Sequence, residues 1–342
     1  MKFKLLGKSG LRVSEICLGT MTFGEDWGWG VDRKESKKIF DAFAEAGGNF
    51  IDTANYYTNG TSEKFLGEFI SAEREKFVLA TKFTLAMRKG DPNSGGNHRK
   101  NILQSVEASL KRLNTDYIDL LWLHAWDFTT PVSEVMRTLN DLVSSGKVLY
   151  IGISDSPAWV VSQANTLAEL RSWIQFTGLQ VEYNLLNRDA ERDLLPMANE
   201  FGITTTAWAP LASGILTGRY NKDANSGGRI KADNIRLTPE NITIAEEVVK
   251  IAGEIGAKPS QVAINWIRQQ SNSIIPILGA SKTSQLVENL GCLDFFLTPE
   301  HLKRLHKISR IQLGFPHDFL RSARVREIIT GGTDNLIEKH RK

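Results

Sequence analysis

Three side chains that can transfer or orient protons close apolar runs of the sequence. Asp52 ends "FID" (50–52), Lys82 ends "FVLATK" (77–82), and His124 ends "YIDLLWLH" (117–124). Each also has an ordinary structural interpretation. Asp52 could cap a turn, Lys82 could lie at the rim in solvent, and His124 could be a hydrogen-bonded histidine of the core. A carboxylate and an ammonium group are costly to bury unless they pair. Their joint occurrence at three successive strand ends therefore favours a shared site.

Two adjacent tyrosines, Tyr56 and Tyr57, follow Asp52 in the same predicted loop. A free phenol has a pKa of about 10 and is a poor acid at neutral pH, but a nearby ammonium group lowers that pKa. Lys82, held by Asp52, would make such a tyrosine a general acid, and His124 would hydrogen-bond to the same substrate oxygen. Spacing alone does not decide which tyrosine faces the lysine.

The elements that position these residues alternate between strand and helix. Eight units of a strand followed by a helix imply parallel pairing, and they favour a closed (β/α)8 TIM barrel over an open doubly wound sheet. No G-x-G-x-x-G follows the first strand, which also disfavours the open sheet. The predicted strands are 16–19, 50–52, 77–82, 117–124, 148–154, 179–183, 204–210 and 273–279; the helices are 33–46, 62–71, 99–113, 132–145, 157–173, 190–201, 239–270 and 283–290, with 239–270 broken at Gly256 and Pro259.

We expect one α/β domain over residues 1–342, with the barrel at about 14–292 and an additional helix and tail at 299–342. Residues 2–13 read as a hairpin, turning around Gly7–Gly10, that plugs the barrel's base. The stretches 84–98 and 218–238 are rich in Gly, Asn, Asp and Lys and read as mobile loops. Residues 310–342 either cover the barrel mouth or extend from it.

Composition excludes several classes of protein. The net charge of +3 is too small and too scattered for a nucleic-acid-binding protein. No run approaches the apolar length of a signal-peptide core or a membrane span. Cys17 and Cys292 read as reduced, buried thiols of a cytoplasmic protein, and no metal site is expected. The expected partner is a small molecule, and homo-oligomers remain open.

Seven motifs together are similar to those of the aldo-keto reductases: "NFIDTANYYTNGTSEKFLG", "VLATK", "LLWLH", "GISD", "LQVEYNLL", "AWAPLASGILTGRY" and "IPILGASKTSQLVENL". They occur in family order, and the resemblance extends from about residue 3 to about residue 309. The resemblance implies a catalytic tetrad of Asp52, Tyr57, Lys82 and His124, with Tyr57 as proton donor and Tyr56 as a rim residue. It also implies NADPH-dependent reduction of aldehydes and ketones.

The resemblance further implies an NADP(H) site across the barrel mouth. Lys282 would meet the 2′-phosphate where Ser281 caps a helix, although a plain surface lysine is the alternative. Two positions depart from the family pattern, because Asp155 replaces an asparagine and Trp208 replaces the tyrosine that stacks on the nicotinamide. The resemblance places Ser154 and Gln180 at the nicotinamide amide, Gly19, Thr20 and Met21 on the opposite wall, Gly214, Leu216 and Gly218 at the pyrophosphate, and Gln285 and Asn289 at the adenine. The other expected cofactor-binding residues are Asp52, Ala209, Pro210, Leu211, Arg219, Gly279 and Glu288.

Trp27, Trp29, Trp126 and Phe128 could form an aromatic substrate pocket, with loop packing as the alternative. Such a wall would favour neutral carbonyl compounds. One rival function is an NADP(H)-binding regulatory or sensor subunit with little turnover, as in the family's potassium-channel β subunits. Another is a phosphosugar isomerase, for which Glu182 is the only carboxylate near a late strand end.

Overall fold

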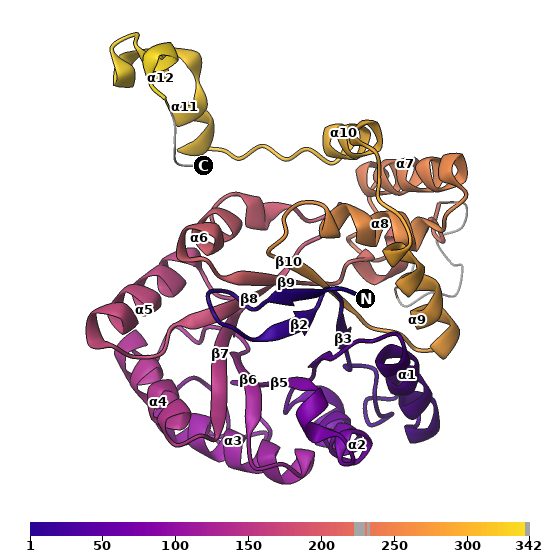
Figure 1. Ribbon diagram of the computed structural model, residues 1–342, viewed down its shortest axis with the longest axis vertical. Helices are drawn as coiled ribbons and strands as arrows, with labels where there is room; N and C mark the ends of the chain where they lie inside the picture. Colours follow the sequence, from indigo (N-terminus) through magenta and orange to yellow (C-terminus); the bar gives the residue numbers. More distant parts are fainter. Residues whose placement is uncertain (222–229, 231–232, 339–342) are drawn as a thin grey trace.

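The computed structural model describes residues 1–221, 230 and 233–338, and its core is a closed barrel of eight parallel strands (Figure 1). The strand order around the barrel is β10-β3-β4-β5-β6-β7-β8-β9, which confirms the predicted (β/α)8 fold. The observed strand bounds differ from the predicted ones by three residues at most. The strands are β3 (Cys17–Gly19), β4 (Phe50–Asp52), β5 (Val78–Phe83), β6 (Ile118–Leu123), β7 (Val148–Ser154), β8 (Phe176–Glu182), β9 (Thr204–Trp208) and β10 (Ile274–Leu278).

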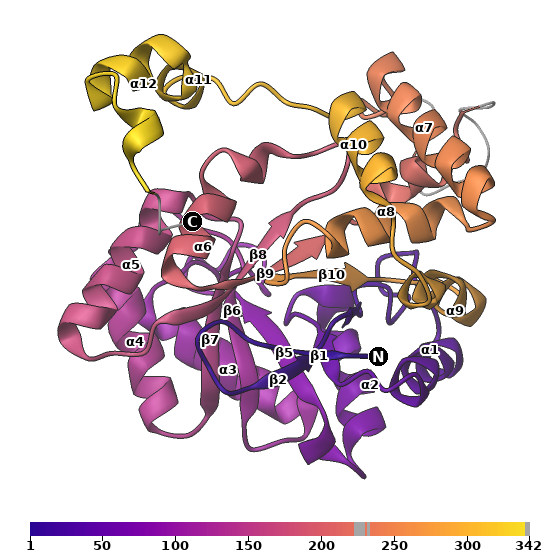
Figure 2. The same ribbon diagram turned by 45° about the horizontal axis from the view of Figure 1, so that its top comes forward.

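Helices surround the barrel (Figure 2), and local signals in the sequence set their ends. Asp32 caps the first helix by accepting from the Glu35 N–H, and Thr238 caps the seventh, where Pro239 follows. Gly256 ends that helix in a left-handed conformation, so the break predicted within 239–270 is present. The helices are α1 (Arg33–Glu45), α2 (Thr61–Ile70), α3 (Arg99–Leu113), α4 (Val132–Ser144), α5 (Ala158–Arg171), α6 (Leu194–Phe201), α7 (Pro239–Ile255), α8 (Pro259–Arg268) and α9 (Thr283–Leu290).

An antiparallel hairpin of β1 (Phe3–Leu5) and β2 (Arg12–Ser14) lies across the end of the barrel where the strands begin. The Gly7 N–H donates to Oγ1 of Thr204, the first residue of β9, at 2.7 Å. Lys4 Nζ donates to the carbonyl of Ile274, the first residue of β10, at 2.8 Å. The hairpin therefore closes the base, as predicted, and leaves the opposite end for a site.

Side chains fill the barrel interior, and Trp122 on β6 is the bulkiest of those that are fully buried. Glycines on the next two strands make room for its ring. A Cβ atom at Gly152 would lie 2.3 Å from the indole, and one at Gly178 would lie 2.6 Å from it. The interior below the mouth is thus a packed core rather than a channel.

The chain beyond the barrel forms α10 (Pro299–Ile308), α11 (His317–Arg321) and α12 (Ala323–Thr330). Figures 1 and 2 show α11 and α12 standing apart from the barrel at the end of an extended segment. Neither helix has a buried residue. The sequence predicts that residues 310–342 either cover the barrel mouth or extend from it. The described part of this segment extends from the barrel.

Two further expectations concern single features of the chain. Cys17 and Cys292 are free, buried thiols, as predicted. Among the helices that the structure describes, none is both long and apolar enough to cross a lipid bilayer. Much of the predicted mobile loop 218–238 lies outside the described residues.

Candidate active site

The register of three neighbouring strands brings Asp52, Lys82 and His124 to one mouth. Asp52, the last residue of β4, pairs with Ala80 of β5, and Lys82 pairs with Trp122 of β6. Because residues two apart on a strand face the same side, Lys82 and then His124 each stand one pleat further along the interior face. The stagger of the barrel therefore aligns the acid, the ammonium group and the imidazole.

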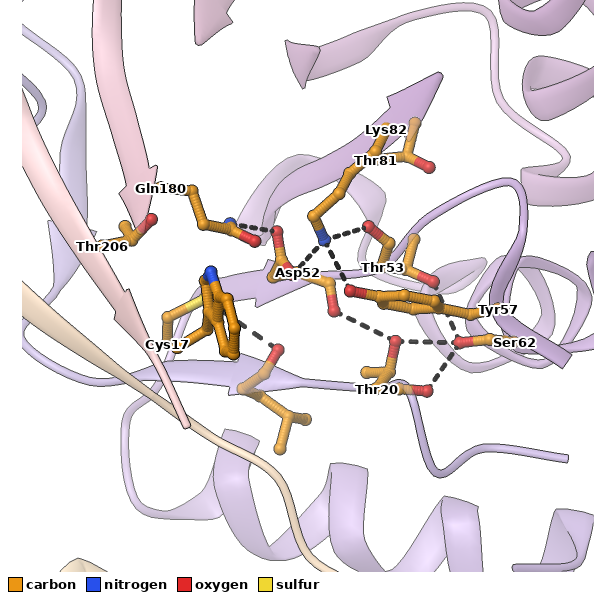
Figure 3. A network of polar contacts seen from close by, with 12 residues as sticks. Cys17, Thr20, Asp52, Thr53, Tyr57, Ser62, Thr81, Lys82, Gln180 and Thr206 are labelled. Carbon is orange, nitrogen blue, oxygen red and sulfur yellow. Dashed lines mark hydrogen bonds and ion pairs between the residues drawn. The ribbon is translucent and has the colours of Figure 1, made fainter. Parts of the chain in front are cut away.

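Lys82 is the centre of this group, and its side chain is completely buried. Its Nζ donates to Asp52 Oδ2 at 2.5 Å, to the Thr53 carbonyl at 2.8 Å and to the Tyr57 hydroxyl at 3.1 Å (Figure 3). All three donors of the ammonium group are thus used. Asp52, only 2% exposed, is the paired carboxylate that burial of a lysine requires.

A tight loop after β4 directs Tyr57 toward the lysine. Residues Tyr57–Gly60 form a 3-10 turn in which Thr58 and Asn59 have positive φ. Thr58 anchors the turn, because its hydroxyl donates to the Phe23 carbonyl at 2.6 Å and accepts from the Ser62 N–H. Tyr56 is 39% exposed, and its ring contacts Trp27. The tyrosine beside Lys82 is therefore Tyr57, and Tyr56 lies at the rim.

Hydroxyl groups form a second layer under the lysine. Ser62 Oγ lies 2.9 Å from the hydroxyls of Thr20 and Thr53, and it also contacts the Thr20 carbonyl (Figure 3). Thr53 is the residue whose carbonyl holds Lys82. This layer was missed in the sequence, since isolated hydroxyl residues in a loop carry no pattern that links them.

The expected lowering of the Tyr57 pKa is wrong. Burial raises the pKa of Tyr57 more than the Lys82 ammonium group lowers it, and the Asp52 carboxylate raises it further. The pKa of Lys82 is also above its ordinary value, because Asp52 and Tyr57 outweigh the cost of burial. At neutral pH the pair is therefore a protonated phenol beside a charged lysine.

His124 follows β6 and stands beside Tyr57, with 6.0 Å between the ring centroids in an edge-to-face arrangement. Burial and the Lys82 charge lower the pKa of His124 to about 3. The imidazole is thus neutral at physiological pH. Its buried Nδ1 has no hydrogen-bond partner among the described residues.

The residues predicted for the nicotinamide end meet around the same mouth. Gln180, 3% exposed, donates from Nε2 to Asp52 Oδ1 at 3.0 Å, so it is already part of the polar network. The Trp208 indole donates from Nε1 to Asp155 Oδ1 at 3.2 Å. The two positions that depart from the family pattern are therefore partners of each other. Ser154 is buried one residue before Asp155.

The predicted cap by Ser281 is wrong. Helix α9 begins at Thr283 with Lys282 in the cap position, and no side chain of its own caps it. The Ser281 hydroxyl donates instead to Gln285 Oε1. Glu35 of α1 caps the start of α9 instead, because its Oε1 accepts from the Thr283 N–H at 2.7 Å and from Thr283 Oγ1 at 2.9 Å. Lys282 itself is exposed, with no ion-pair partner among the described residues.

Several other predicted cofactor residues offer backbone rather than side chains. Leu216 is fully buried in the core, and the Thr20 hydroxyl is occupied by Ser62 and the Asp52 carbonyl. Asn289 is buried, whereas Arg219 and Glu288 are exposed. Positive φ at Ala209, Gly214 and Gly218 gives the segment after β9 a sharply turned path. The remaining positions, Gly19, Met21, Pro210, Leu211 and Gly279, line strand ends or the turns that follow them.

An aromatic cluster stands over Tyr57. The Trp27 ring centroid lies 5.4 Å from that of Trp29, 5.6 Å from Tyr56 and 6.5 Å from Tyr57. Trp126 packs against the core instead, and Phe128 is 71% exposed. No ring contact joins these last two to Trp27 in the described part of the chain. Of the four predicted pocket residues, the structure brings together two.

Two further observations concern metal ligands and the isomerase alternative. Within residues 1–221, 230 and 233–338 there is no group of three His, Cys, Asp or Glu side chains that could hold a metal ion. Glu182, the carboxylate that an isomerase would need, forms a bidentate ion pair with Arg236 at 2.8 and 3.1 Å.

Comparison with known proteins gives consistent relatives. The model of the aldo/keto reductase family matches residues 15–310. An aryl-alcohol dehydrogenase [NADP(+)] of Phanerodontia chrysosporium is 39% identical, over 90% of this chain and 86% of its own. A norsolorinic acid reductase of Aspergillus flavus is 38% identical, over 92% and 83%. The aldo-keto reductase ausK of Aspergillus calidoustus is 36% identical, over 93% and 85%. On the strength of these matches and of its barrel, the chain belongs to the aldo/keto reductase family.

Proposed function

We propose that this protein is an NADPH-dependent reductase of aldehydes and ketones, with aromatic carbonyl compounds as its preferred substrates. The observation that carries the proposal is the triple contact of Lys82, which joins Asp52 to the Tyr57 hydroxyl at the barrel mouth. The name of the Phanerodontia relative, which includes NADP(+) and aryl alcohol, supports the choice of cofactor and substrate.

The described residues suit such a cofactor. Trp208 offers a flat face at the end of β9, and Ser154, Asp155 and Gln180 offer polar groups at the ends of β7 and β8. Lys282, a cation without an ion-pair partner in the described chain, stands at the start of α9 and would bind the 2′-phosphate. The bound cofactor supplies the hydride that reduces the carbonyl carbon.

Proton delivery falls to Tyr57. Its raised pKa keeps the phenol protonated at neutral pH, so it can donate to the carbonyl oxygen. The Lys82 ammonium group at 3.1 Å stabilises the phenolate that remains, and Asp52 holds the ammonium group in place. Neutral His124, beside Tyr57, donates a hydrogen bond that orients the same oxygen.

A pair of matched variants tests this function. Purified protein should oxidise NADPH in the presence of benzaldehyde, and Tyr57→Phe should lower kcat by a factor of about 100 or more while the Kd for NADPH, measured by fluorescence quenching, stays unchanged. Tyr56→Phe serves as the control and should keep wild-type turnover. Equal kcat in both variants would remove Tyr57 from the mechanism. Tight NADPH binding without turnover across a panel of carbonyl compounds would favour the sensor function instead.

A further inference from the structure

The composition of the loop between β5 and α3 predicts that it is mobile. In the structure a buried asparagine holds this loop in place. Asn97 is completely buried, and Ser94 is 4% exposed. The Gly96 N–H donates to the Thr84 carbonyl at 2.7 Å, which folds the loop back onto the end of β5. The Asn97 side chain therefore contacts the interior of the protein rather than solvent.

Asn97 joins the chain on both sides of His124. Its Oδ1 accepts from the Thr84 hydroxyl at 2.7 Å, and that same hydroxyl accepts from the His124 N–H at 3.3 Å. Its Nδ2 donates to the carbonyl of Ala125 at 3.0 Å. One side chain thus holds the peptide group before the histidine, through Thr84, and directly holds the carbonyl of Ala125, the residue after it.

Neighbouring groups hold Asn97 and Thr84 in this arrangement. The Asn97 N–H donates to Asp127 Oδ2 at 2.6 Å, and the Asp127 carboxylate also accepts from the Thr129 and Thr130 N–H groups. Thr84 has a φ of 100°, which is rare for a residue with a branched side chain. Such a conformation persists where neighbouring contacts impose it.

His124 needs support of this kind, since no side-chain hydrogen bond to its imidazole occurs in the described chain and its buried Nδ1 has no partner. The backbone therefore determines where the ring stands. We infer that Asn97, acting through Thr84 and Ala125, is the positioning residue that fixes the His124 imidazole against Tyr57. This inference rests on the proposed role of His124 in orienting the carbonyl.

A double-mutant cycle of Asn97→Ala and His124→Ala tests the inference, with kcat for benzaldehyde and the Kd for NADPH as readouts. Asn97→Ala should lower kcat by about 10- to 100-fold, the range expected for a small misplacement of a reacting group, and leave the Kd unchanged. In the His124→Ala background it should cause no further loss. A second full loss in that background would overturn the inference.

Two more variants separate positioning from general weakening of the fold. Thr84→Val removes the hydroxyl that links Asn97 to His124 and should reproduce the loss of kcat. Thr84→Ser keeps the hydroxyl and should retain the wild-type kcat. Asn165 provides a matched control, because it is equally buried and bridges the backbone of Phe176 at the base of β8, at 2.8 and 3.2 Å. Asn165→Ala should lower the Tm without the change in kcat.

The outcomes also separate this inference from the proposed function. If His124→Ala itself retains wild-type kcat, the role of His124 in the proposed reaction is wrong. If His124→Ala lowers kcat but Asn97→Ala, folded and binding NADPH, does not, the reaction stands and the positioning by Asn97 is wrong. Loss of kcat in Asn165→Ala equal to that in Asn97→Ala would also contradict positioning.

Discussion

Gln180 on β8 donates a hydrogen bond of 3.0 Å to Oδ1 of Asp52 on β4, although 128 positions separate them in the sequence. Lys82 occupies the other oxygen of the same carboxylate. The residue expected to hold the cofactor amide therefore also holds the acid that anchors the lysine. The residue proposed for cofactor binding and the proposed proton donor are thus joined by one hydrogen-bond network through Asp52 and Lys82.

Gln180→Leu is expected to affect both stability and turnover. It leaves a buried carboxylate oxygen without a donor, which costs about 1–3 kcal/mol in the free energy of unfolding. We expect kcat to fall by roughly 10-fold, as Asp52 and Lys82 shift. Urea unfolding and steady-state kinetics check these outcomes. Gln175→Leu, just before β8 and outside this network, is the control, and equal effects of the two substitutions would contradict the coupling.

Lys282→Ala should raise the KM for NADPH by about 10-fold or more and leave the KM for NADH nearly unchanged, because only NADPH carries the 2′-phosphate. Lys258 is the control, since it is also the cap residue of a helix, α8, and its neighbour Gln261 contacts the far end of α9 at Glu288. Lys258→Ala should alter neither constant. A uniform rise for both cofactors would make Lys282 an ordinary surface lysine.

Glu35→Gln should tighten NADPH binding. The carboxylate lies at the start of α9, beside Lys282, where it opposes a second anion. Glutamine keeps an oxygen that accepts from Thr283 and removes the charge. A gain of about 0.3–1 kcal/mol, typical of charges at helix ends, corresponds to roughly a two- to five-fold lower Kd. Isothermal titration with NADPH and with NADH measures it, and an identical change for both would argue against a nearby phosphate.

Trp27→Ala should reduce kcat/KM for benzaldehyde by roughly 10-fold and have little effect on a small aliphatic aldehyde. The reason is that Trp27, edge-on to Tyr57 at 6.5 Å, can contact an aromatic substrate, and such ring pairs contribute about 0.5–1.5 kcal/mol beyond buried area. Trp173 lies outside the site, with the Arg137 guanidinium 5.7 Å from its ring centroid. Trp173→Ala is the control substitution. Equal losses for both aldehydes would assign Trp27 to loop packing.

The barrel was predictable because its signals are local and periodic. The runs ending at Asp52 and Lys82 have strand-like patterns, and parallel pairing then brings their ends together without knowledge of any contact. Glu35 and Asn97 were not predictable in the same way. Each acts across elements, on Thr283 and on Ala125, and nothing in the local pattern of α1 or of the β5–α3 loop indicates those partners.

The pKa of Tyr57 shows why chemistry inferred from residue types can have the wrong sign. The sequence shows that an ammonium group lies near the phenol, which lowers the pKa of the phenol. How far the hydroxyl is withdrawn from water depends on the whole mouth, and here burial outweighs the ammonium group. The direction could only be found after packing was known.

His124 should make folding stability depend on pH. Its pKa of about 3 lies below its ordinary value of 6.5, so the unfolded chain binds the extra proton as the pH falls below about 6.5. Stability from this group is therefore present above pH 6.5 and is lost progressively toward pH 3. His124→Gln should flatten that dependence by about 1 kcal/mol between pH 6.5 and 5, after allowance for partial exposure. Urea unfolding of both proteins at the two pH values measures the difference, and parallel curves would mean that the imidazole is charged or solvated in the fold, which would end its role as a neutral donor.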